Sequence, residues 1–395
     1  MHKVLVLDAN QRSALAIIRS LGRRGLEIVV GDQVANALGA ASRYAAASVQ
    51  YPDPAASPTS FVREIITLAE RLRIDTIFPA TDLTTMLLVS QPNLSKIARL
   101  AAPPAASYEA LTDKARLLEL AGSLGVPIPV TRIANTGGAI LDAARDIGFP
   151  IVLKPARSRY LKGDRVISTS VEIVNDHERL LATLGRLSWL ADIPCLVQQF
   201  IHGHGAGIFA LYASARPAAW FAHRRLREKP PAGGVSVLCE SVPIDAAMQS
   251  SAAKLLSSAG WTGAAMVEFR VDHDGTPYLI EVNGRFWGSL QLAIDCGVDF
   301  PWLLYQIIQG SSAVKPQPYI VGRRLRWLLG DLDSLLISLR EARSSPNTKA
   351  RALSAFLRSF ADLGCRQEIL RFQDPRPGFR EIKDWLNALR PSADG

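Results

Sequence analysis

The stretch VEFRVDHDGTPYLIEVNGRF, Val267–Phe286, reads as two β-strands joined by a tight turn at Asp274-Gly275. Asp-Gly between two apolar-rich runs favours a two-residue type I′ hairpin loop. The ladder that follows from this loop places Glu268 directly opposite Glu281. Their Cβ atoms would then lie about 4.5–5.5 Å apart, a separation at which like charges destabilise a cross-strand pair. The hairpin therefore predicts two carboxylates that need a positive partner.

Alternation along the second strand extends this group. It predicts that the face of Glu281 also carries Leu279, Asn283 and Arg285, and that the other face carries Tyr278, Ile280 and Val282. Carboxylate and amide oxygens suit Mg²⁺ better than zinc, so Glu268, Glu281 and Asn283 are predicted metal ligands. Arg285 suits bidentate phosphate binding. The alternative is a structural cluster in which the carboxylates share a proton or pair with Arg270 or Arg285.

The length and composition of the chain limit the kind of protein to which this hairpin can belong. The chain has 395 residues, 48% of them apolar, which predicts two or three domains or subdomains. Its apolar runs are too short to span a bilayer. MHKVLVLDAN turns polar after a brief apolar run, so we expect a first strand there and no signal peptide. The four cysteines are far apart and form no CxxC pair, which favours a cytoplasmic protein without structural zinc or disulfides.

The net charge of +9 is unevenly distributed. Residues 311–395 hold 15 Lys or Arg and 9 Asp or Glu, so this segment carries +6 of the excess. A basic face can attract nucleic acid, anionic lipid or an acidic substrate. No zinc-finger spacing, RNA-binding aromatic signature or long basic run accompanies it. We interpret it as an arginine-rich helical surface and expect no nucleic-acid partner.

The N-terminal hundred residues alternate short apolar runs with helical patterns, which predicts a parallel sheet covered by helices. Ligands of such sheets bind beyond the carboxyl ends of the strands. Asp8, Asn10, Thr81 and Asp82 follow predicted strands and are candidates there, although each could instead be a cap or turn residue. The first strand is not followed by GxGxxG, so the dinucleotide fingerprint is absent.

Candidate phosphate ligands lie in the middle of the chain. Lys154 stands within PIVLKP, where an unpaired ammonium would be costly, so it is expected to face a phosphate or a carboxylate. Lys114, at a helix start, is a surface residue unless other features tie it to the site. The stretch RSRYLKGDR, residues 157–165, is a candidate phosphate-covering loop. Arg224 and Arg227 precede a strand-like run and are candidates for binding an acidic substrate, or else form a solvated face.

The order of these motifs resembles the ATP-grasp superfamily, specifically carboxylate–amine ligases related to the carbamoyl-phosphate synthase large chain. The resemblance covers about residues 1–310 and rests on TDKARLLELAGSLGVPIP, GFPIVLKP, LVQQFIHG and MVEF…YLIEVNGR. It implies an α/β fold with three parts: a Rossmann-like pre-ATP domain over 1–105, a two-lobed ATP-grasp domain over 106–310, and a mostly helical segment of unknown role over 311–395. Many members dimerise, so a homodimer is one option.

The resemblance also implies residue roles. Lys114 and Lys154 match two nucleotide-contacting lysines, and Arg285 matches the arginine that steadies the transferring phosphate. Glu268, Glu281 and Asn283 match the ligands of Mg²⁺, for which Mn²⁺ is an alternative. The hinge that reads adenine corresponds to Gln198, Gln199, Phe200 and Ile201. Two departures stand out: glutamine replaces the usual hinge glutamate, and the ribose-binding acid falls near His204 or Gly205.

The implied reaction activates a small carboxylate with ATP as an acyl phosphate, releases ADP, and lets an amine form an amide. Phosphoryl transfer needs positioning and charge neutralisation rather than a protein nucleophile. A kinase, a carboxylase and a non-catalytic module that senses ATP are rival interpretations. Substrate specificity is expected from Thr81, Asp82, the segment 224–236 and the last 85 residues.

Overall fold

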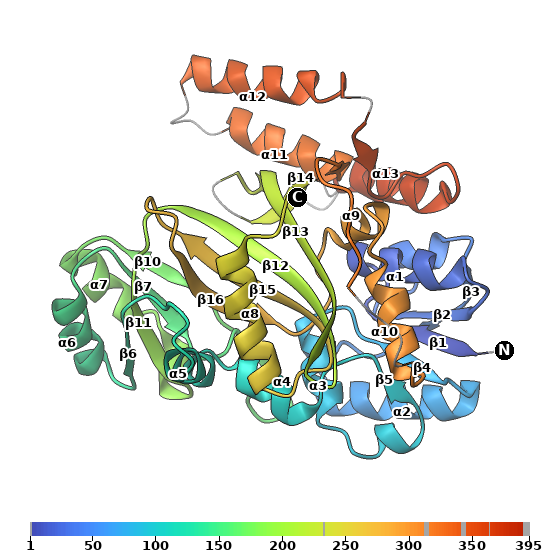
Figure 1. The fold of residues 1–395 in the computed structure, drawn as a ribbon, viewed down its shortest axis with the longest axis horizontal. Helices are drawn as coiled ribbons and strands as arrows, with labels where there is room; N and C mark the ends of the chain where they lie inside the picture. The colour runs from blue at the N-terminus through green and yellow to red at the C-terminus, as the bar shows by residue number, and fades with distance from the viewer. Residues whose placement is uncertain (1, 232–233, 312–315, 341–344, 363, 390–395) are drawn as a thin grey trace, which may run out of the picture.

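The structure is a computed structural model that describes residues 2–231, 234–311, 316–340, 345–362 and 364–389. Its N-terminal part is a five-stranded parallel sheet in the order β3-β2-β1-β4-β5. The strands are β1 (Lys3–Val6), β2 (Glu27–Asp32), β3 (Ala45–Gln50), β4 (Thr76–Phe78) and β5 (Arg99–Leu100), and the helices are α1 (Arg12–Gly22), α2 (Pro58–Leu72) and α3 (Asp82–Val89). The predicted parallel α/β sheet is confirmed (Figure 1).

A four-stranded antiparallel sheet forms a separate lobe in the order β10-β7-β11-β6. Its strands are β6 (Thr131–Ala134), β7 (Ile151–Pro155), β10 (Glu172–Val174) and β11 (Cys195–Gln199), covered by α6 (Gly137–Ile147) and α7 (His177–Leu184). The lobe has its own hydrophobic core, which includes Ile140, Leu153 and Val197. In Figure 1 it lies at the left, away from the N-terminal sheet.

The second lobe is built on a seven-stranded sheet in the order β16-β15-β12-β13-β14-β17-β18. Its strands are β12 (His204–Ala213), β13 (Arg216–Lys229), β14 (Val235–Ser241), β15 (Gly263–Val271), β16 (Pro277–Asn283), β17 (Arg324–Arg326) and β18 (Arg366–Gln367). Helices α4 (Ala105–Thr112), α5 (Lys114–Ser123) and α8 (Ala246–Ser258) contact it. The predicted two-lobed arrangement is confirmed, whereas the domain limits at residues 105 and 310 stay a prediction.

The β15–β16 hairpin has a different turn from the predicted one. Asp272 N–H donates to Thr276 O (3.1 Å), Gly275 N–H donates to Asp272 O (3.3 Å), and only Gly275 of the loop has a positive φ, +85°. A type I′ turn requires positive φ at both central residues, so the loop is one residue longer than predicted. A bulge at Ile280 compensates, because Glu268 pairs Glu281 while Phe269 pairs Leu279.

This bulge corrects the predicted side-chain alternation. Leu279 is fully buried in the same core as Val282, although the sequence placed these residues on opposite faces. The extra residue inverts the facing of the strand between them. The predicted pairing of Glu268 with Glu281 is therefore right, but the two-residue turn behind that prediction is wrong.

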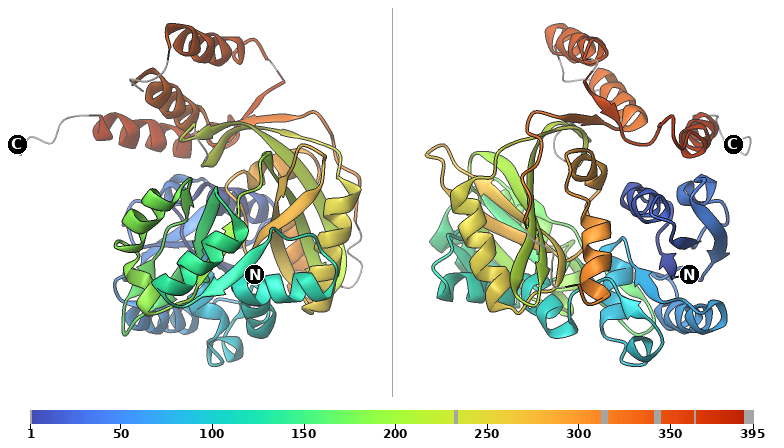
Figure 2. Two further views of the ribbon diagram at one scale, coloured as in Figure 1. Left: turned by 90° about the vertical axis from the view of Figure 1, so that its left-hand side faces the viewer. Right: turned by 45° about the vertical axis from the view of Figure 1, so that its right-hand side comes forward.

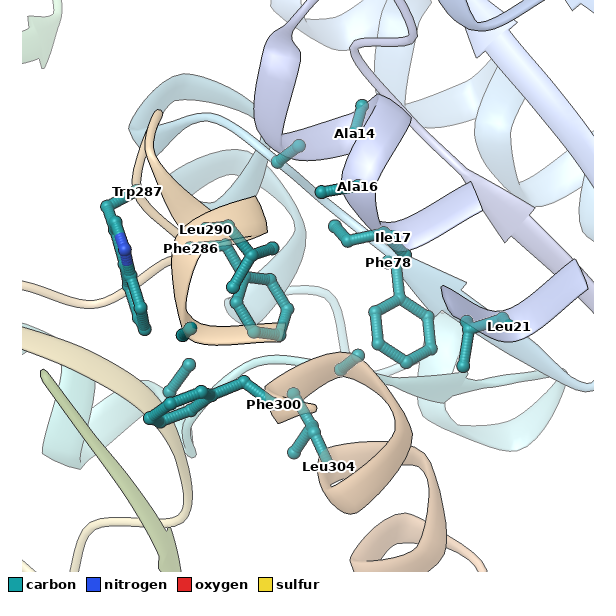
Figure 3. Packing of buried hydrophobic residues seen from close by; sticks show 14 of the residues in the cluster. Ala14, Ala16, Ile17, Leu21, Phe78, Phe286, Trp287, Leu290, Phe300 and Leu304 are labelled. Atoms are coloured by element: carbon teal, nitrogen blue, oxygen red, sulfur yellow. The ribbon is translucent and has the colours of Figure 1, made fainter. Parts of the chain in front are cut away.

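The N-terminal sheet and the second lobe share one hydrophobic core. Helices α9 (Leu290–Asp295) and α10 (Phe300–Ile308) pack against α1. Ile17 and Leu21 of α1 and Phe78 of β4 lie in one cluster with Phe286 and Phe300, all at most 2% exposed (Figure 3). Burying side chains of this size stabilises the contact by about 1.5–3 kcal/mol each. This shared core includes no residue of the four-stranded lobe, whose core is a separate cluster.

The C-terminal segment is mostly helical, as predicted, with α11 (Leu328–Arg340), α12 (Pro346–Arg358) and α13 (Arg376–Ala388). It also supplies β17 and β18 to the large sheet, which the sequence patterns did not indicate. Figure 2 shows α11 and α12 above the large sheet, whereas α13 lies over the N-terminal part, where it contacts the turn Leu38–Ala41. The segment is anchored by buried ion pairs, among them Arg326 with Asp331, both 1% exposed.

Membrane-spanning helices and disulfides can be checked in the part of the chain that the structure describes. None of its helices is both long and apolar enough to cross a membrane. The four cysteines are free thiols, and three of them, Cys195, Cys239 and Cys296, are buried.

Candidate active site

Two glutamates face one another at the centre of the hairpin. Glu268 on β15 and Glu281 on β16 are cross-strand partners, with side chains 25% and 31% exposed. The Asn283 amide bridges them, because its Nδ2 donates to Glu268 Oε1 (2.9 Å) and to Glu281 Oε1 (3.2 Å). The predicted trio of Glu268, Glu281 and Asn283 thus comes together on one face of the sheet.

The two carboxyls have unequal environments. Burial, and then the neighbouring Glu281, raises the pKa of Glu268 above its usual range. Burial acts in the same direction on Glu281, but Lys114 and the Asn283 hydrogen bond outweigh it, so the pKa of Glu281 is lowered. Two neighbouring carboxyls resist being ionised at the same time. Lys114 favours the ionised form of Glu281, so the mutual repulsion raises the pKa of Glu268 instead.

Three cationic side chains border the pair. Lys114 Nζ lies 3.5 Å from Glu281 Oε2 and donates to Ser158 Oγ (2.9 Å). Arg225 Nη2 donates to Glu268 Oε2 (3.2 Å) from strand β13. Arg285 Nη2 lies 3.4 Å from Asn283 Oδ1. Lys114, which the sequence alone left as a surface residue, is therefore only 6% exposed and belongs to the cluster.

Lys154 lies on β7 of the smaller lobe, 7% exposed. Its Nζ donates to Gln198 Oε1 (2.7 Å) on β11, and the Gln198 Nε2 donates to Thr131 Oγ1 (2.9 Å). Burial lowers the pKa of Lys154 to about 8, because the low-dielectric surroundings disfavour the ammonium and the pair of glutamates only partly offsets this. Glutamine at position 198 supplies a dipole but no charge to counter that penalty.

Replacing Gln198 by glutamate should raise the pKa of Lys154 well above about 8, because a carboxylate would then accept its hydrogen bond. In the native chain the folded-state pKa lies below the unfolded value of about 10.4, so folding stability is lost as the pH falls from about 10.4 to about 8, and the full cost is present below about 8. An NMR titration of ¹³Cε-labelled lysine measures this pKa directly. Gln199→Glu is the control, since Gln199 is exposed. An unchanged pKa in Gln198→Glu would contradict the role of Gln198.

The remaining predicted hinge residues follow Gln198 at the end of β11. Phe200 N–H donates to Pro150 O (3.3 Å), and the Arg270 guanidinium lies 5.5 Å from the Phe200 ring centre. Ile201 O accepts from Arg270 Nε (3.1 Å). The carbonyl of Ile201 is thus occupied by an arginine, and the Gln198 side chain by Lys154 and Thr131. A base could still bind the second lone pair of the Ile201 carbonyl, whereas the Gln198 side chain would have to exchange partners.

Asp82 and Thr81 behave differently, although they are adjacent. Arg285 Nε donates to Asp82 Oδ2 (2.8 Å), so Asp82 joins the site across the boundary of the N-terminal sheet. Thr81 is the N-cap of α3, where its Oγ1 accepts from Thr84 N–H (3.2 Å). Thr81 therefore has the role of a helix cap, the second of the two roles that its position in the sequence allowed.

The structure does not bring Arg224 and Arg227 to the carboxylate pair. Arg224 Nε pairs with Glu240 Oε2 (2.8 Å), and Arg227 binds Asp331 with both Nε and Nη2 (2.6 Å each). Alternation along β13 turns Arg225 to the face of Glu268 and Arg224 to the other face, and a bulge at Leu226 then reorients Arg227. Arg224 and Arg227 therefore lie away from the carboxylate pair, and the neighbouring Arg225 borders it; contact of Arg224 and Arg227 with an acidic substrate stays a prediction.

A cavity of about 540 Å³ opens beside Glu281, Asn283 and Lys114. A two-stranded hairpin of β8 (Arg159–Leu161) and β9 (Val166–Ser168) covers one side of it. The loop of this hairpin reaches helix α2 of the N-terminal part, where Thr59 Oγ1 donates to Asp164 Oδ1 (2.7 Å). The predicted covering loop over 157–165 thus exists as a β-hairpin, and Arg157, Ser158 and Arg159 line the cavity.

A second, smaller cavity of about 280 Å³ lies beside Glu268. Its lining includes three arginines, Arg12, Arg225 and Arg285, together with His223 and Ser289. His223 Nε2 and Ser289 Oγ are hydrogen-bonded at 2.8 Å. Burial, reinforced by the Arg225 charge, lowers the pKa of His223 to about 3, so its imidazole is neutral near pH 7. The glutamate pair thus separates two cavities.

Gly284 has a packing requirement that the motif EVNGR does not reveal. A Cβ at this position would lie 2.9 Å from Tyr108 Cδ2 and 3.0 Å from the Trp261 ring. Both aromatic side chains are buried, at 6% and 0% exposed, and cannot move aside freely. Gly284→Ala should therefore cost about 1–3 kcal/mol of folding stability. Thermal denaturation measures this; Gly122→Ala in α5, where no atom lies within 4 Å, should be neutral or stabilising. Equal melting temperatures would contradict the argument.

The residues present fit a hard divalent cation. The donor set of Glu268, Glu281 and Asn283 offers only oxygen ligands once the Asn283 amide oxygen turns toward the carboxylates. A cation would also remove the repulsion that raises the pKa of Glu268. Among the described residues no group of three or more His, Cys, Asp or Glu gathers as a metal site. This leaves the two-glutamate set as the candidate.

Comparisons with known proteins agree with this geometry. A family model described as "ATP-grasp in the biosynthetic pathway with Ter operon" matches residues 194–329. The biotin carboxylase of Campylobacter jejuni, solved with β,γ-ATP, has a similar fold, with a TM-score of 0.66 at 18% identity over 82% of this chain and 74% of that one. This chain is similar to ATP-grasp proteins in its fold and over the segment 194–329, which holds the glutamate hairpin, so the predicted resemblance is confirmed at the level of an ATP-grasp domain.

Relatives found by sequence are partial matches. An uncharacterized protein of Sinorhizobium fredii is 28% identical over 248 residues, 58% of this chain. The D-alanine–D-alanine ligase of Pseudomonas fluorescens is 26% identical over 222 residues, 50% of this chain. The C-terminal section of the carbamoyl phosphate synthase large chain of Methanopyrus kandleri is 32% identical over 94 residues, 24% of this chain. The chain spans 49%, 63% and 16% of these relatives' own lengths.

Proposed function

We propose that this protein is an ATP-dependent ligase that joins a small carboxylic acid to an amine. The observation that carries the proposal is the half-buried pair Glu268 and Glu281, opposed across two strands and bordered by Lys114, Arg225 and Arg285. Such a group of carboxylates and cations suits a bound cation and phosphate oxygens together. A relative named as a ligase supports the same proposal.

The chemistry follows from what this group of residues is suited to do. An oxygen of the substrate carboxylate attacks the γ-phosphorus of ATP, and ADP leaves. The amine nitrogen then attacks the carbonyl carbon of the acyl phosphate, phosphate leaves, and the nitrogen loses a proton. Both steps move negative charge between oxygens, so fixed positive groups lower their barriers without a protein nucleophile.

Each residue has a proposed part. Lys114 and Lys154 hold nucleotide phosphates, Arg285 holds the transferring phosphate, and residues 198–201 hold adenine through the backbone. Glu268, Glu281 and Asn283 would hold Mg²⁺, or Mn²⁺ in its place. The cation supplies charge neutralisation between phosphate oxygens when it is bound. Asp82 orients Arg285 through the 2.8 Å hydrogen bond between them.

A carboxylase is the second candidate, because the fold neighbours include a biotin carboxylase. Bicarbonate would then be the acid that is phosphorylated, with no amide formed. A small-molecule kinase and a non-catalytic ATP-binding module would use the same nucleotide site without forming a carbon–nitrogen bond. A cytoplasmic location and a homodimer are part of the proposal and are tested by cell fractionation and light scattering.

The decisive experiment measures ADP release from Mg-ATP with pools of acids and amines, followed by mass spectrometry of the products. We expect ADP release that needs both an acid and an amine, with an amide as product. ADP release that needs bicarbonate alone would favour the carboxylase, and a phosphorylated product without amide would favour the kinase. Binding of Mg-ATP without turnover in any pool would favour the module.

A further inference from the structure

The smaller cavity lies next to Glu268 but on a different side of the glutamates from the larger one. Lys114 and Glu281 line only the larger cavity, whereas Glu268 and Arg225 line only the smaller one. With about 280 Å³ it can hold a small molecule but not a nucleotide. An acid bound there has its reacting carboxylate within reach of Arg285 and the glutamate pair.

The lining of this cavity contains more arginines than one carboxylate can contact. Three arginines line it and Glu268 is its one acidic residue among those described. The other carboxylates that pair with these arginines, Asp82, Glu228 and Glu368, lie outside the lining. Each arginine keeps one of these counter-charges at hydrogen-bond distance, so the lining offers N–H donors rather than a large net charge. An acid with a single anionic group would leave part of these donors unused.

Arg12 is the arginine that the proposed reaction does not use. It is the first residue of α1 in the N-terminal part, and its side chain lines a cavity whose other residues belong mainly to the second lobe. Glu368 accepts from its Nη1, Ser236 O accepts from its Nη2 (3.3 Å), and the Trp327 ring lies 4.1 Å from its central carbon. The side chain is 12% exposed.

Arg12 is thus held in place and still has donors available. A guanidinium has five N–H groups, and in the described part of the chain Arg12 uses them for Glu368 and Ser236 only. Its Nη2 lies 2.9 Å from where a Cβ of Gly288 would be, so the absence of a side chain at Gly288 makes room for it. Arg285, by contrast, contacts Asp82 and Asn283. Arg12 and Arg285 are therefore held by different partners and line different parts of the cavity.

Another residue of the lining gives a second observation. His223 lines the cavity and is 7% exposed, and its Nδ1 has no hydrogen-bond partner among the described residues. A buried polar nitrogen without a partner is costly, which points to a ligand that completes it.

We propose that the acid substrate of this protein carries a second anionic group, a carboxylate or a phosphate, and that Arg12 binds it while the reacting carboxylate lies beside Arg285. The inference rests on the proposed ligase function and adds the substrate class to it. Glu368 and Trp327 act as positioning residues for Arg12, so the C-terminal segment contributes to specificity without touching the substrate.

The test measures binding of three probes by calorimetry with Mg-ADP present: glutarate, 3-phosphonopropionate and butyrate. Glutarate or 3-phosphonopropionate should bind roughly 10- to 100-fold more tightly than butyrate, as expected for one added charged hydrogen-bonded contact. Whichever diacid binds more tightly distinguishes a carboxylate from a phosphate. Arg12→Gln should remove the preference, Arg12→Lys should keep part of it, and Arg145→Gln on the exposed surface of α6 should change nothing.

Equal affinity of the wild type for butyrate and both diacids would overturn the inference, as would a preference that survives Arg12→Gln. The wild-type comparison stands even if a variant fails to fold. Mg-ADP affinity is measured separately in the same experiment: if the nucleotide binds but no diacid does, the inference fails and the proposed function stands. If the nucleotide itself does not bind, the proposed function fails.

Discussion

Replacing Glu268 by glutamine should lower the rate of ADP release by roughly 10²–10³-fold, the usual loss when one preorganised electrostatic group is removed. It should also raise the melting temperature of the ligand-free protein. Burial and Glu281 hold the pKa of Glu268 above its usual range, so the ionised form opposes folding near neutral pH. Glutamine keeps the shape and removes that charge.

The sign of the pH dependence provides an internal check. A carboxyl whose folded-state pKa is raised contributes stability below its unfolded pKa and loses it as the pH rises through the folded pKa. The difference in melting temperature between Glu268→Gln and wild type should therefore widen as the pH rises through the pKa of Glu268. Differential scanning calorimetry at several pH values measures it, and a Mg-ATP-dependent shift should be present in wild type only.

Glu178→Gln is the control for this substitution, because Glu178 is exposed on α7 in the smaller lobe. It should change neither activity nor melting temperature. If Glu268→Gln instead lowered the melting temperature and kept the activity, the glutamate pair would be a structural cluster neutralised by Arg225. The hairpin would then have no metal-binding role.

Asp331→Asn should cost about 3–5 kcal/mol of folding stability, the range for breaking a buried ion pair from one side. Asp331 is 1% exposed and accepts from Arg227 Nη2 (2.6 Å) and from Arg326 Nε (2.7 Å). Arg326 is equally buried, and its Nη2 has no partner in the described residues. Without the aspartate, its charge would stay buried without a counter-charge.

Asp333→Asn on the same helix is the matched control. Asp333 pairs with Lys229 and accepts from Trp385 Nε1 (2.8 Å), but its side chain is 23% exposed, so solvent screens the pair. Its loss should cost about 1 kcal/mol or less. Denaturant midpoints of the two variants compare them directly. Equal midpoints would mean that the ion pairs of Asp331 with Arg227 and Arg326 stabilise the fold no more than an ordinary surface ion pair does.

The sequence predicted the class of fold and the central group of residues because both rest on local patterns. Strand–helix alternation requires only neighbouring residues, and the spacing of Glu268, Glu281 and Asn283 belongs to one hairpin. The turn was wrong because Asp-Gly also occurs in a three-residue loop, in which only the glycine needs a positive φ. The pairing was still right, because the bulge at Ile280 restored the register.

What the sequence could not predict depends on long-range contacts. Arg224, Arg225 and Arg227 are nearly equivalent in the sequence, and only the partner strands and the bulge at Leu226 decide which of them faces Glu268. Alternation counted from His223 could have singled out Arg225 only if the face of β13 had been known. Strands β17 and β18 have three and two residues, too few for a periodic signal.

The buried contacts of α1 set an order of events during synthesis. Arg19 is 3% exposed, and its Nε and Nη2 donate to Asp374 Oδ2 (2.9 Å) and Ile369 O (2.7 Å), which lie 355 and 350 residues further along the chain. At about 5–20 residues per second, a ribosome needs roughly 20–70 s to make these partners after Arg19 has emerged. Until then the guanidinium of Arg19 in the nascent chain lacks these buried partners. The buried contacts of α1 are therefore complete only after the C-terminal segment has been made. Premature termination or a stalled ribosome would release an N-terminal fragment prone to aggregation and degradation.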